Sequence, residues 1–132
     1  MTALHPHWVV RILGALVLLA VGGIHLFLVF DGVGGVLGVL FVLNAAAALV
    51  LLIGMLVARG RLLQWTTVLS LLFVIATLAA LLLALTVGLF GITEVWTFTL
   101  VPQTIVVEAI GIVVLAIATA VVFRRPAVPA TT

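Results

Sequence analysis

The chain has 132 residues, of which 67% are hydrophobic and 6% are charged. Soluble domains carry about a quarter charged residues, so this composition excludes an ordinary soluble domain and indicates an integral membrane protein in contact with lipids. Five dispersed arginines make no basic stripe, which argues against nucleic acid as a partner. The chain has no cysteine and no lysine, which excludes disulfides, iron–sulfur clusters and Schiff-base chemistry.

Four apolar segments are long enough to span a bilayer, because a spanning helix needs about 20 mostly apolar residues. They are predicted at residues 9–30, 34–58, 62–90 and 99–123. The first is longer than the apolar core of a signal peptide, so we expect it to be retained. Short connections make consecutive helices antiparallel neighbours. The sequence therefore predicts an all-α, up-down-up-down bundle of four helices, forming a single transmembrane domain over residues 1–132.

The arginines indicate an orientation for this bundle. In the predicted layout one side holds all five, namely Arg11, Arg59, Arg61, Arg124 and Arg125. The opposite side holds Asp31 and Glu94 and no basic residue. Because basic residues accumulate on the cytoplasmic side, we expect both termini to be cytoplasmic in a multi-pass protein of the plasma (inner) membrane.

Small and polar residues recur at helical spacing in each segment, and such stripes are typical of close contacts between membrane helices. We call these stripes the predicted seams. They comprise Gly14, Leu18, Gly22 and His25 in the first helix; Asn44, Ala47, Leu51, Gly54 and Ala58 in the second; Ser70, Thr77, Ala84 and Gly88 in the third; and Thr104, Glu108, Gly111, Leu115 and Ala118 in the fourth. The polar members of the seams should face inward.

Glu108 is the most informative of these residues, because an ionised side chain at mid-bilayer costs roughly 2.5–3.5 kcal/mol on insertion scales. Counting 1.5 Å per residue places His25, Asn44 and Glu108 at a similar depth, roughly 8–15 Å from the outer boundary. Glu94 would lie above them. We therefore expect an outward-facing polar cluster of His25, Asn44, Glu108 and Glu94, which Gln103 and Thr104 would extend.

Binding or passing a small cation is the most concrete function for such a cluster. For a proton, Glu108 would be the carrier, His25 its relay, Asn44 a positioning amide and Glu94 the charge at the entrance. For a divalent metal ion, His25 and Glu108 would be ligands. Haem held by two histidines is not expected, because the membrane segments contain one histidine. No catalytic motif is present, so no catalytic residue is assigned and an enzyme is not expected.

Three alternatives stay open at this point. The cluster could be structural, with a protonated Glu108 hydrogen-bonded to Asn44 or His25. The protein could be an accessory subunit of a larger respiratory or transport complex, since almost nothing extends beyond the membrane. It could also bind a lipid or another small ligand in an outer cavity. Because four helices enclose a narrow space, a homo-oligomer is a further expectation.

Four short motifs resemble those of a group of uncharacterised small four-helix integral membrane proteins of actinobacteria. The motifs are GGIHLFL at residues 22–28, LFVLN at 40–44, VGLFGITE at 87–94 and VEA at 107–109. The resemblance implies the four-helix fold, and the motifs contain His25, Asn44, Glu94 and Glu108. It implies no particular activity. The loop at Asp31–Gly35 is shorter than is common in that group.

Overall fold

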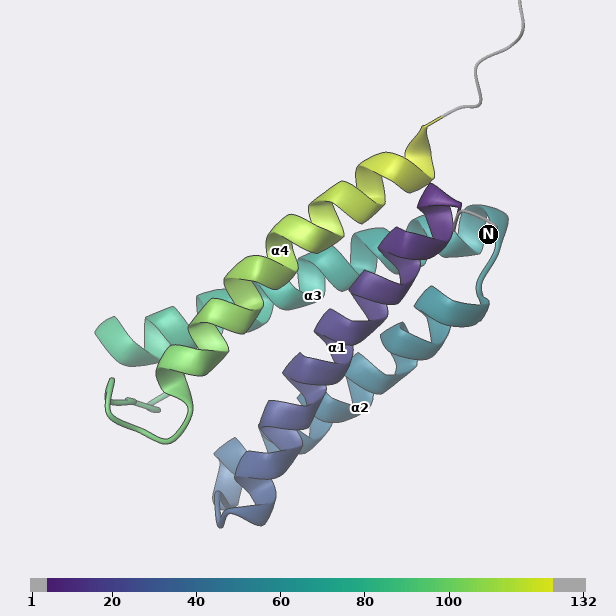
Figure 1. The fold of residues 1–132 in the computed structure, drawn as a ribbon. Coiled ribbons are helices and arrows are strands. Elements are labelled where there is room, and N and C mark those ends of the chain that lie inside the picture. The colour runs from purple at the N-terminus through teal and green to yellow at the C-terminus, as the bar shows by residue number, and fades with distance from the viewer. Residues whose placement is uncertain (1–4, 125–132) are drawn as a thin grey trace, which may run out of the picture.

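The computed structural model describes residues 5–124, and Arg125 lies outside this range. The described residues form four helices and no strand: α1 (Pro6–Phe30), α2 (Gly35–Val57), α3 (Gly60–Thr86) and α4 (Val101–Phe123) (Figure 1). Each helix is long and apolar enough to cross a membrane. Consecutive helices run in opposite directions, so the predicted all-α, four-helix membrane fold is confirmed.

The helix boundaries differ from the predicted ones mainly between α3 and α4. The third helix was predicted to run to residue 90, but α3 ends at Thr86, and α4 begins at Val101 rather than at residue 99. At the other end of the chain, α1 begins at Pro6, three residues earlier than predicted, because proline is favourable in the first helical turn. The connection over residues 87–100 is therefore longer than the sequence indicated.

Backbone geometry explains why α3 stops early. Gly88 has a φ of +84°, and its N–H donates to the carbonyl of Leu83 at 2.8 Å, which is the glycine-dependent way of ending a helix. Phe90 and Gly91 then both have positive φ between the paired residues Leu89 and Ile92, as in a tight hairpin turn. Hydropathy does not register the two glycines that make this turn, so a prediction from hydropathy extends the helix too far.

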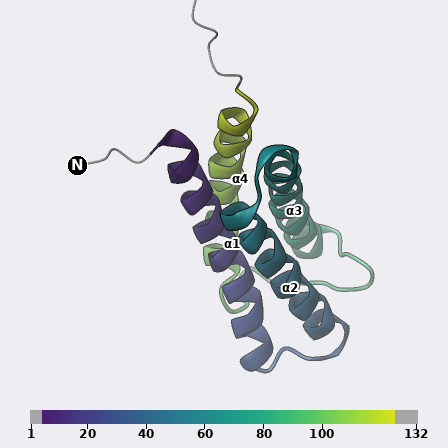
Figure 2. The same ribbon diagram turned by 90° about the vertical axis from the view of Figure 1, so that its right-hand side faces the viewer.

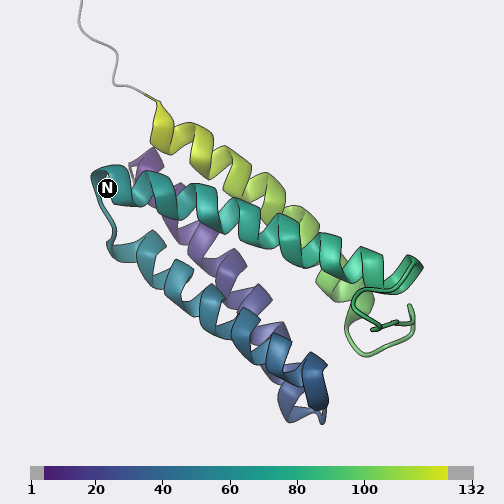
Figure 3. The same ribbon diagram turned by 180° about the vertical axis from the view of Figure 1, so that it is seen from behind.

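The helix termini and connections define two ends of the bundle. The start of α1, the end of α4 and the α2–α3 connection lie together at one end, which we call the arginine end (Figure 2). The connections over residues 31–34 and 87–100 lie at the opposite, loop end. Towards the loop end the α1–α2 hairpin diverges from the α3–α4 hairpin, as opposite views show (Figures 1 and 3).

Packing is uneven around the bundle. Helix α1 packs extensively against α2 and α4, and α3 packs against α4, whereas α2 and α3 make far fewer contacts although they are consecutive. The core therefore runs along α1 and α4, where Leu18, Val21 and Leu115 are almost completely buried. The side between α2 and α3 is left open.

Glycines permit the close approach of the core helices. A Cβ added at Gly22 of α1 would lie 2.9 Å from the Cβ of Ala48 on α2. One added at Gly111 of α4 would lie 2.6 Å from a side-chain carbon of Val17 on α1. Both distances are shorter than real carbon contacts, so these two positions accept only glycine at the present helix spacing.

The predicted seams are confirmed on α1 and α4, where all their members are buried. On α2 the seam is confirmed only in part: Ala58 is 3% exposed, but the buried residues within the helix are Gly38, Ala48 and Met55. Asn44 and Ala47 are half-buried instead. The reason is that α2 packs against α1 with one face and turns an adjacent face to the open side of the bundle.

Arg11 joins the helices at the arginine end. It lies on α1 and is 8% exposed, with Nε donating to the carbonyl of Met55 at 2.7 Å. Its Nη2 donates to the carbonyls of Leu56 and Ala58, both at 2.8 Å. These carbonyls end α2 and have no intrahelical partner, and the positive charge also opposes the negative end of the helix dipole. The guanidinium in addition lies over the ring of Trp8, 4.5 Å from its centre.

We expect Arg11→Met to destabilise the protein by about 2–4 kcal/mol, because three charge-assisted hydrogen bonds to the end of α2 are lost. Unfolding in mixed micelles with an increasing fraction of denaturing detergent would measure the change. Arg61→Met is the matched control, since Arg61 is exposed at the same end, and it should change stability by less than about 0.5 kcal/mol. Equal effects of the two substitutions would contradict the role of Arg11.

The neighbouring glycines of α1 offer a second matched pair. Gly22→Leu should destabilise by about 1–3 kcal/mol through overpacking against Ala48. Gly23 has nothing within 4 Å of an added Cβ, so Gly23→Leu should be neutral or stabilising, because leucine is the better helix former. Both variants gain the same helix propensity, and the difference between their unfolding free energies therefore isolates the α1–α2 contact. A difference near zero would show that the hairpin relaxes freely.

Candidate functional site

A cavity of about 420 Å³ occupies the open side of the bundle near the loop end. Its walls come from the last turns of α1, the first half of α2, the second half of α3, the start of α4 and the connection over residues 87–100. Most of the lining side chains are apolar, among them Leu28, Phe41 and Phe98. The cavity exists because α2 and α3 separate towards this end.

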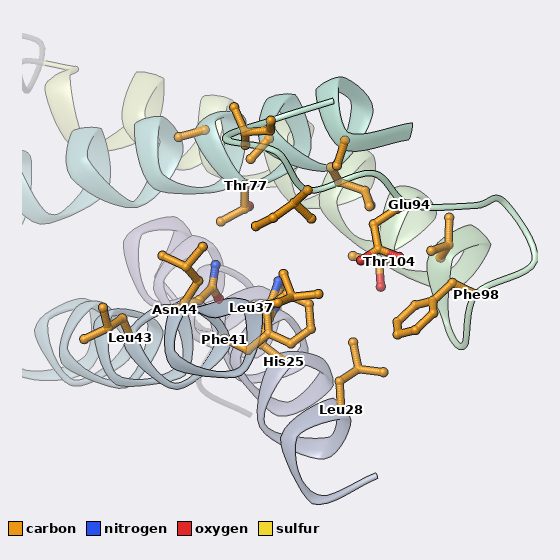
Figure 4. A pocket seen from close by; sticks show the side chains of 18 of the residues that line it. His25, Leu28, Leu37, Phe41, Leu43, Asn44, Thr77, Glu94, Phe98 and Thr104 are labelled. Atoms are coloured by element: carbon orange, nitrogen blue, oxygen red, sulfur yellow. The ribbon is translucent and has the colours of Figure 1, made fainter. Parts of the chain in front are cut away.

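Polar side chains reach this cavity from four different elements. His25 comes from α1, Asn44 from α2, Thr77 from α3 and Glu94 from the connection, and all four point into the space between the hairpins (Figure 4). Thr104 of α4 also lines the cavity. A mostly apolar hollow with a few convergent polar groups is the usual form of a small-molecule site.

His25 is held in a fixed orientation. Its Nδ1 lies 2.8 Å from the carbonyl oxygen of Val21, one turn earlier on α1. A carbonyl can only accept, so Nδ1 carries the hydrogen and Nε2 of the neutral ring is left as an acceptor. The ring packs edge-on against Phe41 of α2, with 5.0 Å between the ring centres. Sequence reasoning did not identify Phe41, because a phenylalanine in an apolar helix carries no distinctive signal.

The hydroxyl groups of the cavity wall already donate to the backbone. Thr77 donates to the carbonyl of Val74 at 2.9 Å, and Thr104 donates to that of Leu100 at 2.7 Å. Their oxygens therefore offer mainly acceptor capacity to the cavity. Oδ1 of Asn44 is buried and has no hydrogen-bond partner among residues 5–124. An unpaired acceptor in an apolar wall is costly unless a ligand or water donates to it.

Glu94 is positioned by the fold of the connection. Its backbone N–H donates to the carbonyl of Ala84 at 2.9 Å, which brings the connection back over the end of α3. The side chain lies outside the membrane-spanning helices, and partial burial raises the pKa of its carboxyl above the ordinary value of about 4.5. No arginine of residues 5–124 lines the cavity, so Glu94 has no arginine partner there.

Glu108 does not line the cavity. It lies on the buried face of α4, one turn below Thr104 and next to Gly111, whose neighbours are Val17 of α1 and Val74 of α3. The residue is 1% exposed, and neither carboxyl oxygen has a hydrogen-bond partner among residues 5–124. The polar side chain that approaches it is Thr77, whose hydroxyl donates to Val74 instead. Glu108 thus lies beneath the cavity, between it and the packed core.

The predicted cluster is therefore divided in space. His25, Asn44, Glu94 and Thr104 share one cavity, Glu108 lies below it, and Gln103 is exposed on the outside of α4. Residues 5–124 contain no group of three His, Cys, Asp or Glu side chains that could hold a metal ion. Metal binding by His25 and Glu108 stays a prediction, and it would need further ligands of other types.

No protein-family model, no curated protein and no solved structure matches this chain. The four helices nonetheless define its class, which is that of a small multi-pass integral membrane protein. The resemblance to small actinobacterial membrane proteins stays a prediction from the four motifs.

Proposed function

We propose that the protein binds a small, mostly apolar ligand of the membrane in the cavity at the loop end. The observation that carries this proposal is the cavity itself, about 420 Å³ of largely apolar space into which His25, Asn44, Thr77 and Glu94 point. Sites for small organic ligands typically measure about 300–1,000 Å³ and combine apolar walls with a few polar groups. If the arginine end is cytoplasmic, as the distribution of arginine favours, the cavity opens towards the outer side.

The same geometry gives less support to a cation as the ligand of this cavity. A metal ion or alkali cation requires several oxygen or nitrogen atoms arranged around one point. Residues 5–124 contain no group of three His, Cys, Asp or Glu side chains that could hold a metal ion, and Glu108, the strongest predicted carrier, is outside the cavity. An organic molecule can use single polar groups from four different elements, because its own body fills the apolar space beside them.

Photolabelling tests the proposal with three probes of one chain length, each bearing a diazirine and ending in a hydroxyl, an ammonium or a carboxylate group. In liposomes, at least one probe should label cavity residues of the wild type. Ala80→Phe fills the cavity from α3 and should reduce that labelling about tenfold. Ala79→Phe is the matched control, because Ala79 is exposed and does not line the cavity.

Labelling that is unchanged in Ala80→Phe, with both variants as stable as the wild type, would overturn the proposal. A cavity that holds a ligand must lose it when a phenyl ring occupies the space. Thermal unfolding of the two variants separates this result from a general loss of structure, since both carry the same substitution on the same helix.

Proton binding is a second candidate function, favoured by the environment of Glu108. A carboxylate that is 1% exposed and without a partner would be an unpaired buried charge, which costs several kcal/mol. The packing therefore accommodates the neutral acid. Thr77 approaches Glu108 and also lines the cavity, and Thr104 lines the cavity one turn from Glu108 on α4, which offers a proton a route towards the cavity.

Infrared difference spectroscopy and proton flux in liposomes test this candidate together. If Glu108 exchanges protons, its protonated-carboxyl band should disappear as the pH is raised, and Glu108→Gln should lack both the band and the flux. The matched control is Thr119→Ala, since Thr119 lies on the same helix and only donates to the carbonyl of Leu115. A band that persists at every pH, without flux, would leave Glu108 a packing residue.

An accessory role in a larger complex, and assembly into a homo-oligomer, stay predictions. The cavity is compatible with either, because it faces the open side of a single chain.

A further inference from the structure

The cavity does not end at the polar side chains but continues along the bundle. An open groove lined by Val50, Leu51, Leu69 and Leu72 lies between α2 and α3 towards the arginine end. It shares Ala47 and Phe73 with the cavity, so the two hollows form one crevice. From Ala84 to Leu69 the crevice follows α3 for roughly 22 Å at 1.5 Å per residue. That length covers most of a hydrocarbon core of about 30 Å.

Small residues keep this crevice open on its two sides. Ala46 and Ala47 face it from α2, while Ala76 and Ala80 face it from α3. Because α2 and α3 make few contacts, the crevice is accessible from the side of the bundle that would face lipid. An apolar groove of this length can take an extended hydrocarbon chain along the helices.

The polar end of the crevice offers mainly hydrogen-bond acceptors. Three groups already donate hydrogen bonds to backbone carbonyls: Nδ1–H of His25 and the hydroxyls of Thr77 and Thr104. What remains are Nε2 of His25, the carboxyl group of Glu94 and the two threonine oxygens, whereas Oδ1 of Asn44 is itself buried. The donors left over are the amide nitrogen of Asn44 and the hydroxyl of Thr99, which is exposed at the rim.

The charged residues near the crevice also disfavour an anionic head group. No arginine lines the cavity or the groove, and within residues 5–124 Arg11 is bonded to the end of α2 at the arginine end. Glu94 is the acidic side chain at the polar end, and His25 is the other titratable group there. A phosphate or carboxylate head group would find neither a cation nor a set of free donors, so it would be repelled.

We propose that the ligand is a chain lipid whose head group donates hydrogen bonds and is neutral or cationic, such as a hydroxyl or an amine. This inference rests on the proposed function of the cavity. The head group lies among His25, Asn44 and Glu94, and the chain lies in the crevice between α2 and α3, which it reaches sideways from the bilayer.

The three photolabelling probes test the inference when they are compared with one another, with a fourth probe that ends in a methyl ether. The hydroxyl and ammonium probes should label the groove around Leu69 and Leu72. The ether, which cannot donate, and the carboxylate should label it about tenfold less. Glu94→Gln should reduce ammonium labelling far more than hydroxyl labelling, because it removes the negative charge and keeps an acceptor oxygen at the same place.

The inference also predicts the direction in which labelling by the ammonium probe changes with pH. Burial raises the pKa of Glu94 above its ordinary value of about 4.5. As the pH is lowered, the carboxyl group therefore becomes neutral earlier than that of an exposed glutamate. The advantage of the ammonium over the hydroxyl probe should therefore be full at a pH well above the raised pKa of Glu94 and should decline as the pH falls through that pKa. His25 would also repel an ammonium group once protonated, and Glu94→Gln reveals how much of the decline belongs to His25.

The outcomes separate this inference from the proposed function. Carboxylate labelling as strong as hydroxyl labelling, and lost in Ala80→Phe, would overturn the head-group assignment while the cavity still binds a ligand. Labelling of residues outside the α2–α3 crevice would overturn the placement of the chain. If Ala80→Phe reduced the labelling by none of the probes, the proposed function itself would be overturned.

Discussion

The structure depends on how the end of α2 is held. Two residues, Ala58 and Arg59, connect α2 to α3, and Arg11 of α1 binds the last carbonyls of α2 through three hydrogen bonds. These features hold α1, α2 and α3 together at the arginine end. Nothing comparable among the described residues joins α2 to α3 at the loop end, where the two helices separate. The cavity follows from this asymmetry, because a bundle joined at one end can open only at the other.

The uses of the backbone carbonyls explain the chemistry of the cavity. A hydroxyl or imidazole N–H in an apolar helix is best satisfied by a carbonyl three or four residues earlier, as in His25, Thr77 and Thr104. Each such bond removes a donor from the wall and leaves an acceptor facing the cavity. Isolated polar residues on membrane helices thus tend to create acceptor-rich surfaces. Selectivity for a donating head group would then need no dedicated residue except Glu94, which supplies the charge.

Much of the fold could be predicted from the sequence, because bilayer thickness limits what an apolar segment of 20 or more residues can do. The seams of α1 and α4 were also predictable, since both helices pack on two neighbours and bury their small residues. The seam of α2 was not, because spacing shows which residues share a face but not what that face meets. Arg11 was read only as an orientation signal, and its contact with α2 joins residues more than 40 positions apart.

The position of Glu108 could not be predicted from its depth in the membrane. Counting residues placed it level with His25 and Asn44, and depth alone cannot show that the packed stripe of α4 turns it away from their cavity. Thr77 is the residue that relates the two regions, since it lines the cavity and also approaches Glu108. A ligand that displaced the Thr77 hydroxyl from the carbonyl of Val74 would free a donor beside an unpartnered carboxyl. Ligand binding and proton binding would then be linked through one side chain, because the energy of each would depend on which acceptor Thr77 serves.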